Sequence, residues 1–173
     1  MTDDLSGRTA VITGGGSGIG AAIARGLAAA GCQVAITGRR QERLDEVLAA
    51  DDSILARTSD VAERESVTEF FAWANDALGQ IDILVNSAGI NTPRRAMTEL
   101  TPDDWDKLIG VNLTGAYNCL HAVLPQMVQR QDGVIVNISS VAGKRAGTIG
   151  GVAYNASKFG MGALGTTVAA EHR

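Results

Sequence analysis

The chain has 173 residues, of which 45% are hydrophobic and 20% charged, a composition typical of a folded domain rather than a disordered segment. Fifteen Lys and Arg against nineteen Asp and Glu give a net charge of −4, which predicts no general attraction to nucleic acid or anionic lipid. No apolar stretch approaches the roughly 18 residues of a membrane span, and the acidic start of the chain lacks an apolar signal segment. We therefore expect a soluble cytoplasmic protein without a metal site, in which Cys32 and Cys119 are free, buried thiols.

Strands and helices alternate along the predicted chain. Short β-branched runs without alternating polar residues predict buried parallel strands at 9–13, 33–37, 83–86 and 133–139, with a weaker strand at 53–57. Segments of helical length and spacing lie between and after them, at 18–30, 41–50, 63–78, 102–131 with breaks, and 153–171. This order predicts a doubly wound parallel sheet between two helix layers, a Rossmann-like α/β fold that forms one domain over residues 1–173.

The last predicted helix has an unusual surface. It carries no charge from Phe159 to Ala170, so it cannot present an ordinary solvated face. Gly160, Gly162 and Gly165 each weaken a helix by about 1 kcal/mol and favour close approach of another backbone. We expect a homodimer or homotetramer that packs through helices near 112–130 and 153–171. The alternative is a glycine-rich helix left exposed by truncation.

A glycine-rich turn follows the first predicted strand. Its candidate ligand-binding residues are Gly14, Gly16, Ser17, Gly18, Ile19 and Gly20. Glycines between a strand and a helix N-terminus allow close approach of a ligand while the unpaired helix amides point at its phosphates. The spacing departs from the pattern GxGxxG, because the third glycine of that pattern would fall on Ile19. The turn alone is weak support for a phosphate site, since a strained structural loop has the same composition.

Two arginines follow the second predicted strand, at the position where a dinucleotide fold contacts the adenosine ribose. NAD-binding proteins carry a carboxylate there, but here Arg39 and Arg40 precede the next acid, Glu42. Two guanidinium groups favour the 2′-phosphate of NADP(H) over NAD(H), although two solvated arginines are the alternative. Asp60, followed by Val61, is a candidate for the adenine amino group or, more simply, an N-cap of the helix that begins at Glu63.

Three residues near the end of the chain are typical of a proton-transfer site. Tyr154 and Lys158 stand four residues apart on a predicted helix, so the phenol and the ammonium share one face. A nearby cation favours the charged form of a phenol and lets it exchange a proton with an alcohol or carbonyl oxygen. Ser140, at the end of the fifth predicted strand, can donate to the same oxygen. Taken singly, these residues are more often a surface pair and a cap.

With these motifs in place, the sequence resembles the short-chain dehydrogenase/reductase family over essentially its whole length. The matching motifs are Thr13-Gly14-x-x-x-Gly18-x-Gly20, Asp60-Val61, Asn86-Ser87-Ala88-Gly89, Val111-Asn112-Leu113, Ser140 and Tyr154-x-x-x-Lys158. The resemblance implies that Asn86, Ala88 and Gly89 line the cofactor ribose.

The same resemblance implies roles for the candidate catalytic residues. Tyr154 would be the general acid/base, and Ser140 would orient and polarise the substrate oxygen. Lys158 would bind the nicotinamide ribose, and Asn112 would hold a water in a proton relay. We expect an NADP(H)-dependent oxidoreductase that moves hydride between the nicotinamide and a small carbonyl or secondary alcohol. The alternatives are a nucleotide-binding module without turnover, and an epimerase or dehydratase on the same scaffold.

Members of this family usually have about 250 residues, so we expect residues 1–173 to be a C-terminally incomplete domain; the alternative is a natural short form. The fifth predicted strand would then be an exposed sheet edge. Because substrate specificity in the family resides largely in the following segment, the resemblance does not name a substrate.

Overall fold

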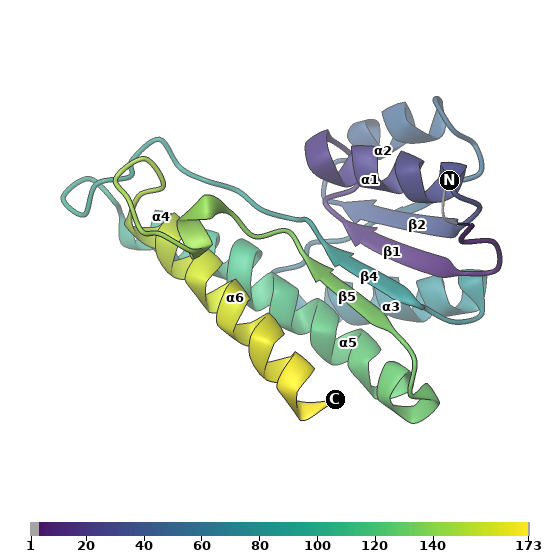
Figure 1. Cartoon of the computed structure of the whole chain (residues 1–173). Helices are drawn as coiled ribbons and strands as arrows, with labels where there is room; N and C mark the ends of the chain where they lie inside the picture. The colour runs from purple at the N-terminus through teal and green to yellow at the C-terminus, as the bar shows by residue number, and fades with distance from the viewer. Residues whose placement is uncertain (1–3, 173) are drawn as a thin grey trace.

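The computed structural model describes residues 4–172 and confirms the predicted fold class (Figure 1). Its strands are β1 (Thr9–Thr13), β2 (Gln33–Gly38), β3 (Leu55–Thr58), β4 (Ile83–Asn86) and β5 (Val134–Asn137). They form one parallel sheet in the order β3-β2-β1-β4-β5. The strand order reverses between β1 and β4, which opens a crevice at the carboxyl ends of these two strands.

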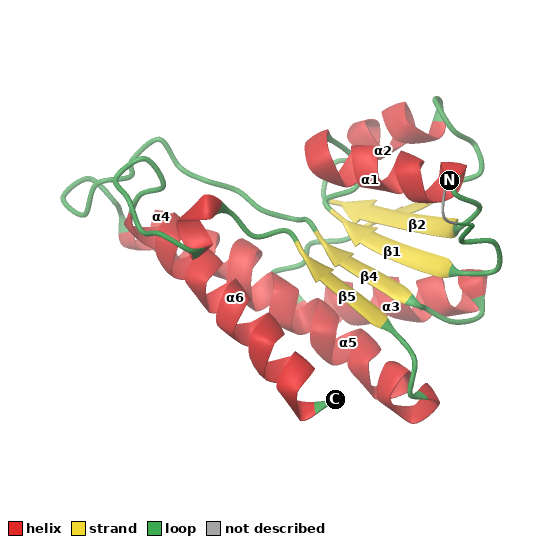
Figure 2. Ribbon diagram, in the orientation of Figure 1, coloured by secondary structure: helices red, strands yellow, loops and turns green. Residues whose placement is uncertain are grey.

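Helices cover both faces of the sheet, as Figure 2 shows. On one face lie α1 (Gly18–Ala29) and α2 (Gln41–Leu48), and on the other lie α3 (Arg64–Leu78), α5 (Gly115–Arg130) and α6 (Val152–Glu171). The predicted helix over 102–131 is divided into α4 (Pro102–Ile109), a π-helical segment (Gly110–Thr114) and α5. One short 3₁₀ turn (Val141–Gly143) links β5 to the loop before α6.

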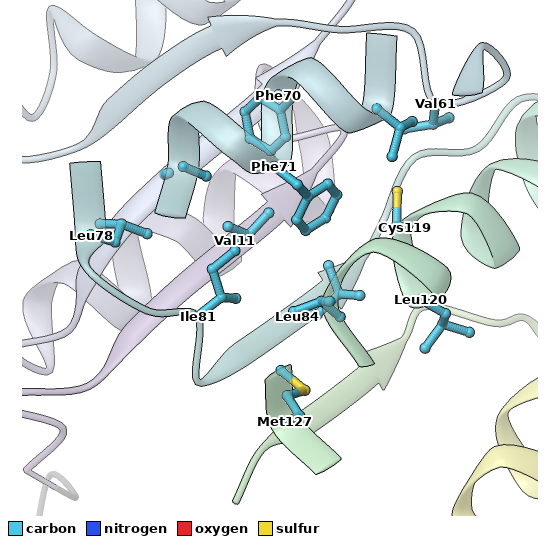
Figure 3. Packing of buried hydrophobic residues seen from close by; sticks show 14 of the residues in the cluster. Val11, Val61, Phe70, Phe71, Leu78, Ile81, Leu84, Cys119, Leu120 and Met127 are labelled. Atoms are coloured by element: carbon cyan, nitrogen blue, oxygen red, sulfur yellow. The ribbon is translucent and has the colours of Figure 1, made fainter. Parts of the chain in front are cut away.

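Buried side chains alternate between the two faces of each strand, so the sheet separates two apolar cores. Val11 and Leu84 point toward α3 and α5, where Phe70 and Phe71 also pack (Figure 3). The next residue of β1, Ile12, points toward α1 and α2 and belongs to the second core. Each large apolar side chain that is fully buried stabilises the fold by about 1.5 to 3 kcal/mol, so the strand pattern fixes which face each helix covers.

Local hydrogen bonds explain two differences from the predicted element bounds. β3 begins at Leu55 rather than 53, because the carboxylate of Asp51 accepts from the main-chain amide and the hydroxyl of Ser53 and forms a turn there. α3 begins at Arg64, and its N-cap Glu63 makes no side-chain cap bond. The predicted N-cap role of Asp60 is therefore wrong: its carboxylate accepts from the Ala62 amide, 3.0 Å away, in the turn that precedes the helix.

β5 lies at the sheet edge and is shorter than the predicted strand at 133–139. Val134 and Val136 are 53% and 40% exposed on the face that α1 and α2 cover for the other strands, whereas Ile135 packs against the core on the opposite face. This uncovered strand is the exposed edge that the sequence predicts.

The glycines of α6 have a different explanation from the predicted one. A Cβ on Gly160 would lie 2.7 Å from the Leu113 side chain, and a Cβ on Gly165 would lie 2.7 Å from the amide of Asn137. Two of the three glycines therefore accommodate side chains of this same chain rather than another backbone. Gly162 faces open space, since a Cβ there would meet no atom within 4 Å among the described residues.

The amino ends of the strands, opposite the crevice, are held by a buried carboxylate. Asp82 is 1% exposed, and its Oδ2 accepts from the Thr9 amide at 3.0 Å. Its Oδ1 accepts from the Gln80 side chain at 2.8 Å and lies 3.7 Å from the Arg130 guanidinium. These contacts join β1, β4 and the end of α5.

Within residues 4–172, no helix combines the length and apolarity that crossing a membrane requires.

Candidate active site

A crevice of about 1020 Å³ lies at the carboxyl ends of the strands, where the strand order reverses. It brings together most of the predicted site residues. Those that line it are Gly14, Gly16, Ser17, Gly18, Ile19, Gly20, Arg39, Arg40, Asp60, Val61, Ala88, Gly89, Ser140, Tyr154 and Lys158. Asn86 and Asn112 are buried and do not belong to this lining.

The glycine turn leads from β1 into α1 with open amides. Gly14 has φ of +66°, and a Cβ on Gly20 would lie 2.4 Å from the carbonyl oxygen of Gly14, so a larger residue at either position would strain the turn. Ser17 is the N-cap of α1, but its side chain makes no cap hydrogen bond. The first amides of α1 have no intrahelical partners, so the start of the helix offers free hydrogen-bond donors beside the crevice.

The Thr13 hydroxyl joins this turn to the loop after β4. Its Oγ1 accepts hydrogen bonds from the amides of Ser87 and Ala88, each at 3.1 Å. A Cβ on Gly14 would lie 2.9 Å from the backbone of Ala88. The two loops that flank the strand reversal are thus held in contact by the Thr13 hydroxyl and by close backbone packing.

The end of β2 contributes the positive charge next to the turn. Arg39 and Arg40 are exposed, and Arg40 is the N-cap of α2. The Arg39 Nη1 lies 3.9 Å from a carboxylate oxygen of Asp60, a distance of loose ion pairing that leaves most guanidinium donors available. Arg43, one turn into α2, pairs with Glu46 at 2.8 Å.

Tyr154 and Lys158 lie on the face of α6 that borders the crevice. The Lys158 Nζ is 5.7 Å from the Tyr154 ring centroid and donates to the Ile138 carbonyl at 2.7 Å. Lys158 is only 4% exposed, and burial lowers the pKa of its ammonium. Within residues 4–172, no carboxylate lies at salt-bridge distance from it. Such a cation lacks a protein counterion, so an anion or a hydroxyl group in the crevice would stabilise it.

Ser140 caps the 3₁₀ turn between β5 and α6. Its Oγ accepts from the Ala142 amide at 3.1 Å, which fixes the position of the oxygen and leaves the hydroxyl proton available as a donor. Ser139, its neighbour, also lines the crevice.

Asn112 lies in the π-helical segment and is fully buried. Its Oδ1 accepts from the Ile90 amide at 2.8 Å, and its Nδ2 donates to the Ile90 carbonyl at 2.9 Å and to Ser157 Oγ at 3.2 Å. The side chain therefore joins the loop after β4 to α6. Protein partners occupy the side-chain amide of Asn112. These contacts do not test whether Asn112 also holds a water, so that role stays a prediction.

Asn86 ends β4 beneath the same loop. Its Nδ2 donates to Asn137 Oδ1 at 3.0 Å, and its Oδ1 has no partner within the described residues. A direct contact with a cofactor ribose stays a prediction for this residue.

Several residues on the crevice were not anticipated from the sequence. They are Arg43, Asn91, Arg95, Val141, Arg145, Asn155 and the loop at 146–150. For the loop at 146–150, the signal in the sequence is the run of glycines and apolar residues between Ser140 and Tyr154. Arg95 has no local signal, because its place depends on a tertiary contact with Ile149.

Comparison of the chain with known proteins identifies its family. A model of the short chain dehydrogenase family matches residues 8–173. The chain belongs to the short-chain dehydrogenase family. Among solved structures, a metagenomic short-chain oxidoreductase in complex with NADP matches with a TM-score of 0.89 and 40% identity over 97% of this chain and 77% of that one. Levodione reductase matches with a TM-score of 0.91 and 32% identity, over 96% of this chain and 66% of that one.

Curated relatives of this short-chain dehydrogenase are named as oxidoreductases. An acetoacetyl-CoA reductase of Shinella zoogloeoides is 41% identical over 88% of this chain and 63% of its own length. An uncharacterized oxidoreductase of Staphylococcus saprophyticus is 41% identical over 90% of this chain and 68% of its own length. The chain thus spans about two thirds of the length of these relatives.

Proposed function

We propose that this protein is an NADP(H)-dependent oxidoreductase that transfers hydride between the nicotinamide and a carbonyl or secondary alcohol. The observation that carries the proposal is that a single crevice is lined by an anion-binding glycine turn and by Tyr154 and Lys158. Membership of the short-chain dehydrogenase family supports the reaction class. A relative named acetoacetyl-CoA reductase and a neighbour in complex with NADP support the substrate class and the cofactor.

The residues of the crevice fit this dinucleotide. The open amides at the start of α1 suit its pyrophosphate, and Gly18 faces open space with φ of +54°. Arg39 and Arg40 would bind the 2′-phosphate, which favours NADP(H) over NAD(H). Asp60 and Val61 would lie against the adenine, while Ala88 and Gly89 would border the ribose. Bound NADP(H) supplies the hydride, and the protein supplies orientation and the proton.

Tyr154 would donate the proton to the carbonyl oxygen in reduction and accept it in the reverse reaction. Ser140 would donate a hydrogen bond to that oxygen as negative charge develops on it. Lys158, a buried cation with no carboxylate at salt-bridge distance among residues 4–172, would stabilise the phenolate and bind the ribose hydroxyl groups. Asn112 would act as a positioning residue, because it holds the loop at Ile90 against α6.

The test is the Tyr154→Phe variant, assayed for ketone-dependent NADPH oxidation. We expect a rate loss of about a hundredfold or more with unchanged NADPH binding, because the ring remains and the proton donor is removed. Tyr117→Phe is the matched control, since Tyr117 is an exposed tyrosine on α5 outside the crevice lining. A Tyr154→Phe rate near that of the wild type would contradict the proposal. NADPH binding without oxidation in the wild type would favour a nucleotide-binding module, and product formation without net cofactor consumption would favour an epimerase or dehydratase.

We also propose that the protein forms a homodimer or homotetramer through α5 and α6. Val128 and Phe159 are 43% and 44% exposed on these helices, and a Cβ on Gly162 would meet no atom within 4 Å among the described residues. Sedimentation velocity at micromolar concentration should therefore show an assembly larger than one chain, and a monomer would refute the proposed assembly.

We also propose a cytoplasmic location, which the two free, buried cysteines support.

A further inference from the structure

Apart from Lys158, the positive charge of the crevice comes from two groups of arginines, although the whole chain has a net charge of −4. Arg39, Arg40 and Arg43 belong to the end beside the glycine turn. Arg95 and Arg145 belong to the opposite end, on loops that adjoin Ser140 and the start of α6. The first group is accounted for by the proposed cofactor phosphates. The second group has no role in the proposed chemistry.

The two arginines of the second group differ in what their side chains contact. The Arg95 Nε donates to the Thr92 carbonyl at 3.0 Å, and its Nη1 donates to the Ile149 carbonyl at 2.7 Å. Arg95 therefore holds the loop at 146–150 in place. Arg145 is exposed to the crevice, and no carboxylate among residues 4–172 lies at salt-bridge distance from it. Its guanidinium donors are available to a ligand.

Exposed apolar side chains and neutral polar groups line the crevice near Arg145, the polar ones including Asn91, Thr148 and Asn155. Val141 and Ile149 line this end of the crevice and are 77% and 85% exposed. Among the described lining residues, Asp60 is the only acid, and it lies at the other end beside Arg39. A free cation among exposed apolar side chains suits a ligand that combines a carbon skeleton with an anionic group. The planar guanidinium fork matches a carboxylate in particular, because it can donate two parallel hydrogen bonds.

We propose that the substrate is a ketone or secondary alcohol that carries a carboxylate, and that Arg145 is the residue that binds this carboxylate. Val141 and Ile149 then contact the carbon skeleton, while the reacting oxygen lies at Tyr154 and Ser140. This assignment rests on the proposed oxidoreductase function. It makes Arg145 a specificity determinant, and the proton transfer itself does not involve it.

The test compares keto acids with their neutral methyl esters. The probes are pyruvate, acetoacetate and levulinate, which place the carboxylate at increasing distance from the ketone, each paired with its ester. Binding to the protein with NADP⁺ is measured by saturation-transfer NMR, which detects weak ligands and needs no turnover. Ketone-dependent NADPH oxidation is measured in parallel. The variants are Arg145→Gln and the matched control Lys144→Gln, which removes the same charge from a neighbouring residue outside the crevice lining.

We expect at least one keto acid to bind the wild type roughly ten- to hundredfold more tightly than its ester, as a charge-assisted hydrogen bond allows. Arg145→Gln should abolish this preference while leaving ester binding unchanged, and Lys144→Gln should keep it. Equal binding of acids and esters, absence of binding by all probes, or a preference that survives Arg145→Gln would overturn the assignment. A preference for the acids without any NADPH oxidation would support Arg145 as the carboxylate site and remove the proposed redox function instead.

Discussion

The ammonium of Lys158 donates to the main-chain carbonyl of Ile138, 2.7 Å away, just beyond the end of β5. The same ammonium lies 5.7 Å from the centre of the Tyr154 ring. One buried cation thus ties α6 to the sheet and sets the electrostatic surroundings of the candidate proton donor. The hydrogen bond orients the ammonium. Burial makes its charge costly, because no carboxylate in the described part of the chain pairs with it.

This burial predicts a pH dependence of stability. Because burial lowers the pKa of Lys158 below its usual 10.5, the unfolded chain binds more protons than the folded one between the lowered value and 10.5. The free energy of unfolding that Lys158 contributes should therefore rise with pH across this window. Guanidinium unfolding between pH 8 and about pH 10.5 measures how the free energy of unfolding depends on pH in the wild type and in Lys158→Met. Parallel pH profiles for the two proteins would contradict the prediction.

Substitution of Arg39 should separate the two nicotinamide cofactors. Arg39→Ala is expected to weaken NADPH binding by about tenfold, since it removes a charged hydrogen bond to the 2′-phosphate at a half-exposed position. NADH binding should change little. Titration of cofactor fluorescence measures both affinities, with Arg25→Ala, an exposed arginine on α1 outside the crevice lining, as the control. Equal losses for the two cofactors would refute a 2′-phosphate site at Arg39.

The two cysteines should be unreactive until the protein unfolds. Burial raises the pKa of the Cys119 thiol to about 12 and also raises the pKa of Cys32, so little thiolate exists at pH 8 in either. We expect Ellman's reagent to label neither thiol in the native protein and both in guanidinium. Single Cys32→Ala and Cys119→Ala variants assign each reaction. Rapid stoichiometric labelling without denaturant would contradict the burial of the labelled cysteine, Cys119 in the core beneath α5 or Cys32 in the core on the opposite face of the sheet.

Loss of the Asp82 carboxylate should destabilise the fold without changing the chemistry. Asp82→Ala leaves the Thr9 amide without its buried acceptor and removes the carboxylate 3.7 Å from the Arg130 guanidinium, which we expect to lower the free energy of unfolding by about 3 kcal/mol. Denaturant titration measures the loss, and the exposed Asp76 on α3 provides the control variant Asp76→Ala. If the free energy of unfolding falls no more than in the control, the contacts of the Asp82 carboxylate contribute little to stability.

The sequence patterns that predicted this structure correctly are local. The central strands β1, β2 and β4 are mostly buried on both faces, so apolar residues dominate them. The four-residue spacing of Tyr154 and Lys158 follows from helix geometry alone. The same reasoning located the glycine turn, because its glycines lie between a strand and a helix.

The features that could not be predicted depend on tertiary contacts. The Asn112 side chain bonds to Ile90, 22 residues earlier, and no local pattern indicates that pairing. Arg145 reaches the crevice because of the path of the loop after Ser140, which sequence spacing does not determine. The break of the long helix into a π-helical segment at Asn112 likewise accompanies this contact, whereas helical periodicity alone predicted an unspecified break.

The brace at Asp82 and the crevice occupy opposite ends of the same strands. Mutations near Asp82 can therefore increase stability without altering ligand recognition. Mutations in the loops at the carboxyl ends of the strands can alter ligand recognition without disturbing the contacts of Asp82. Laboratory selection for heat tolerance and selection for new substrates should accordingly enrich mutations in separate halves of each strand, and the two sets should combine additively.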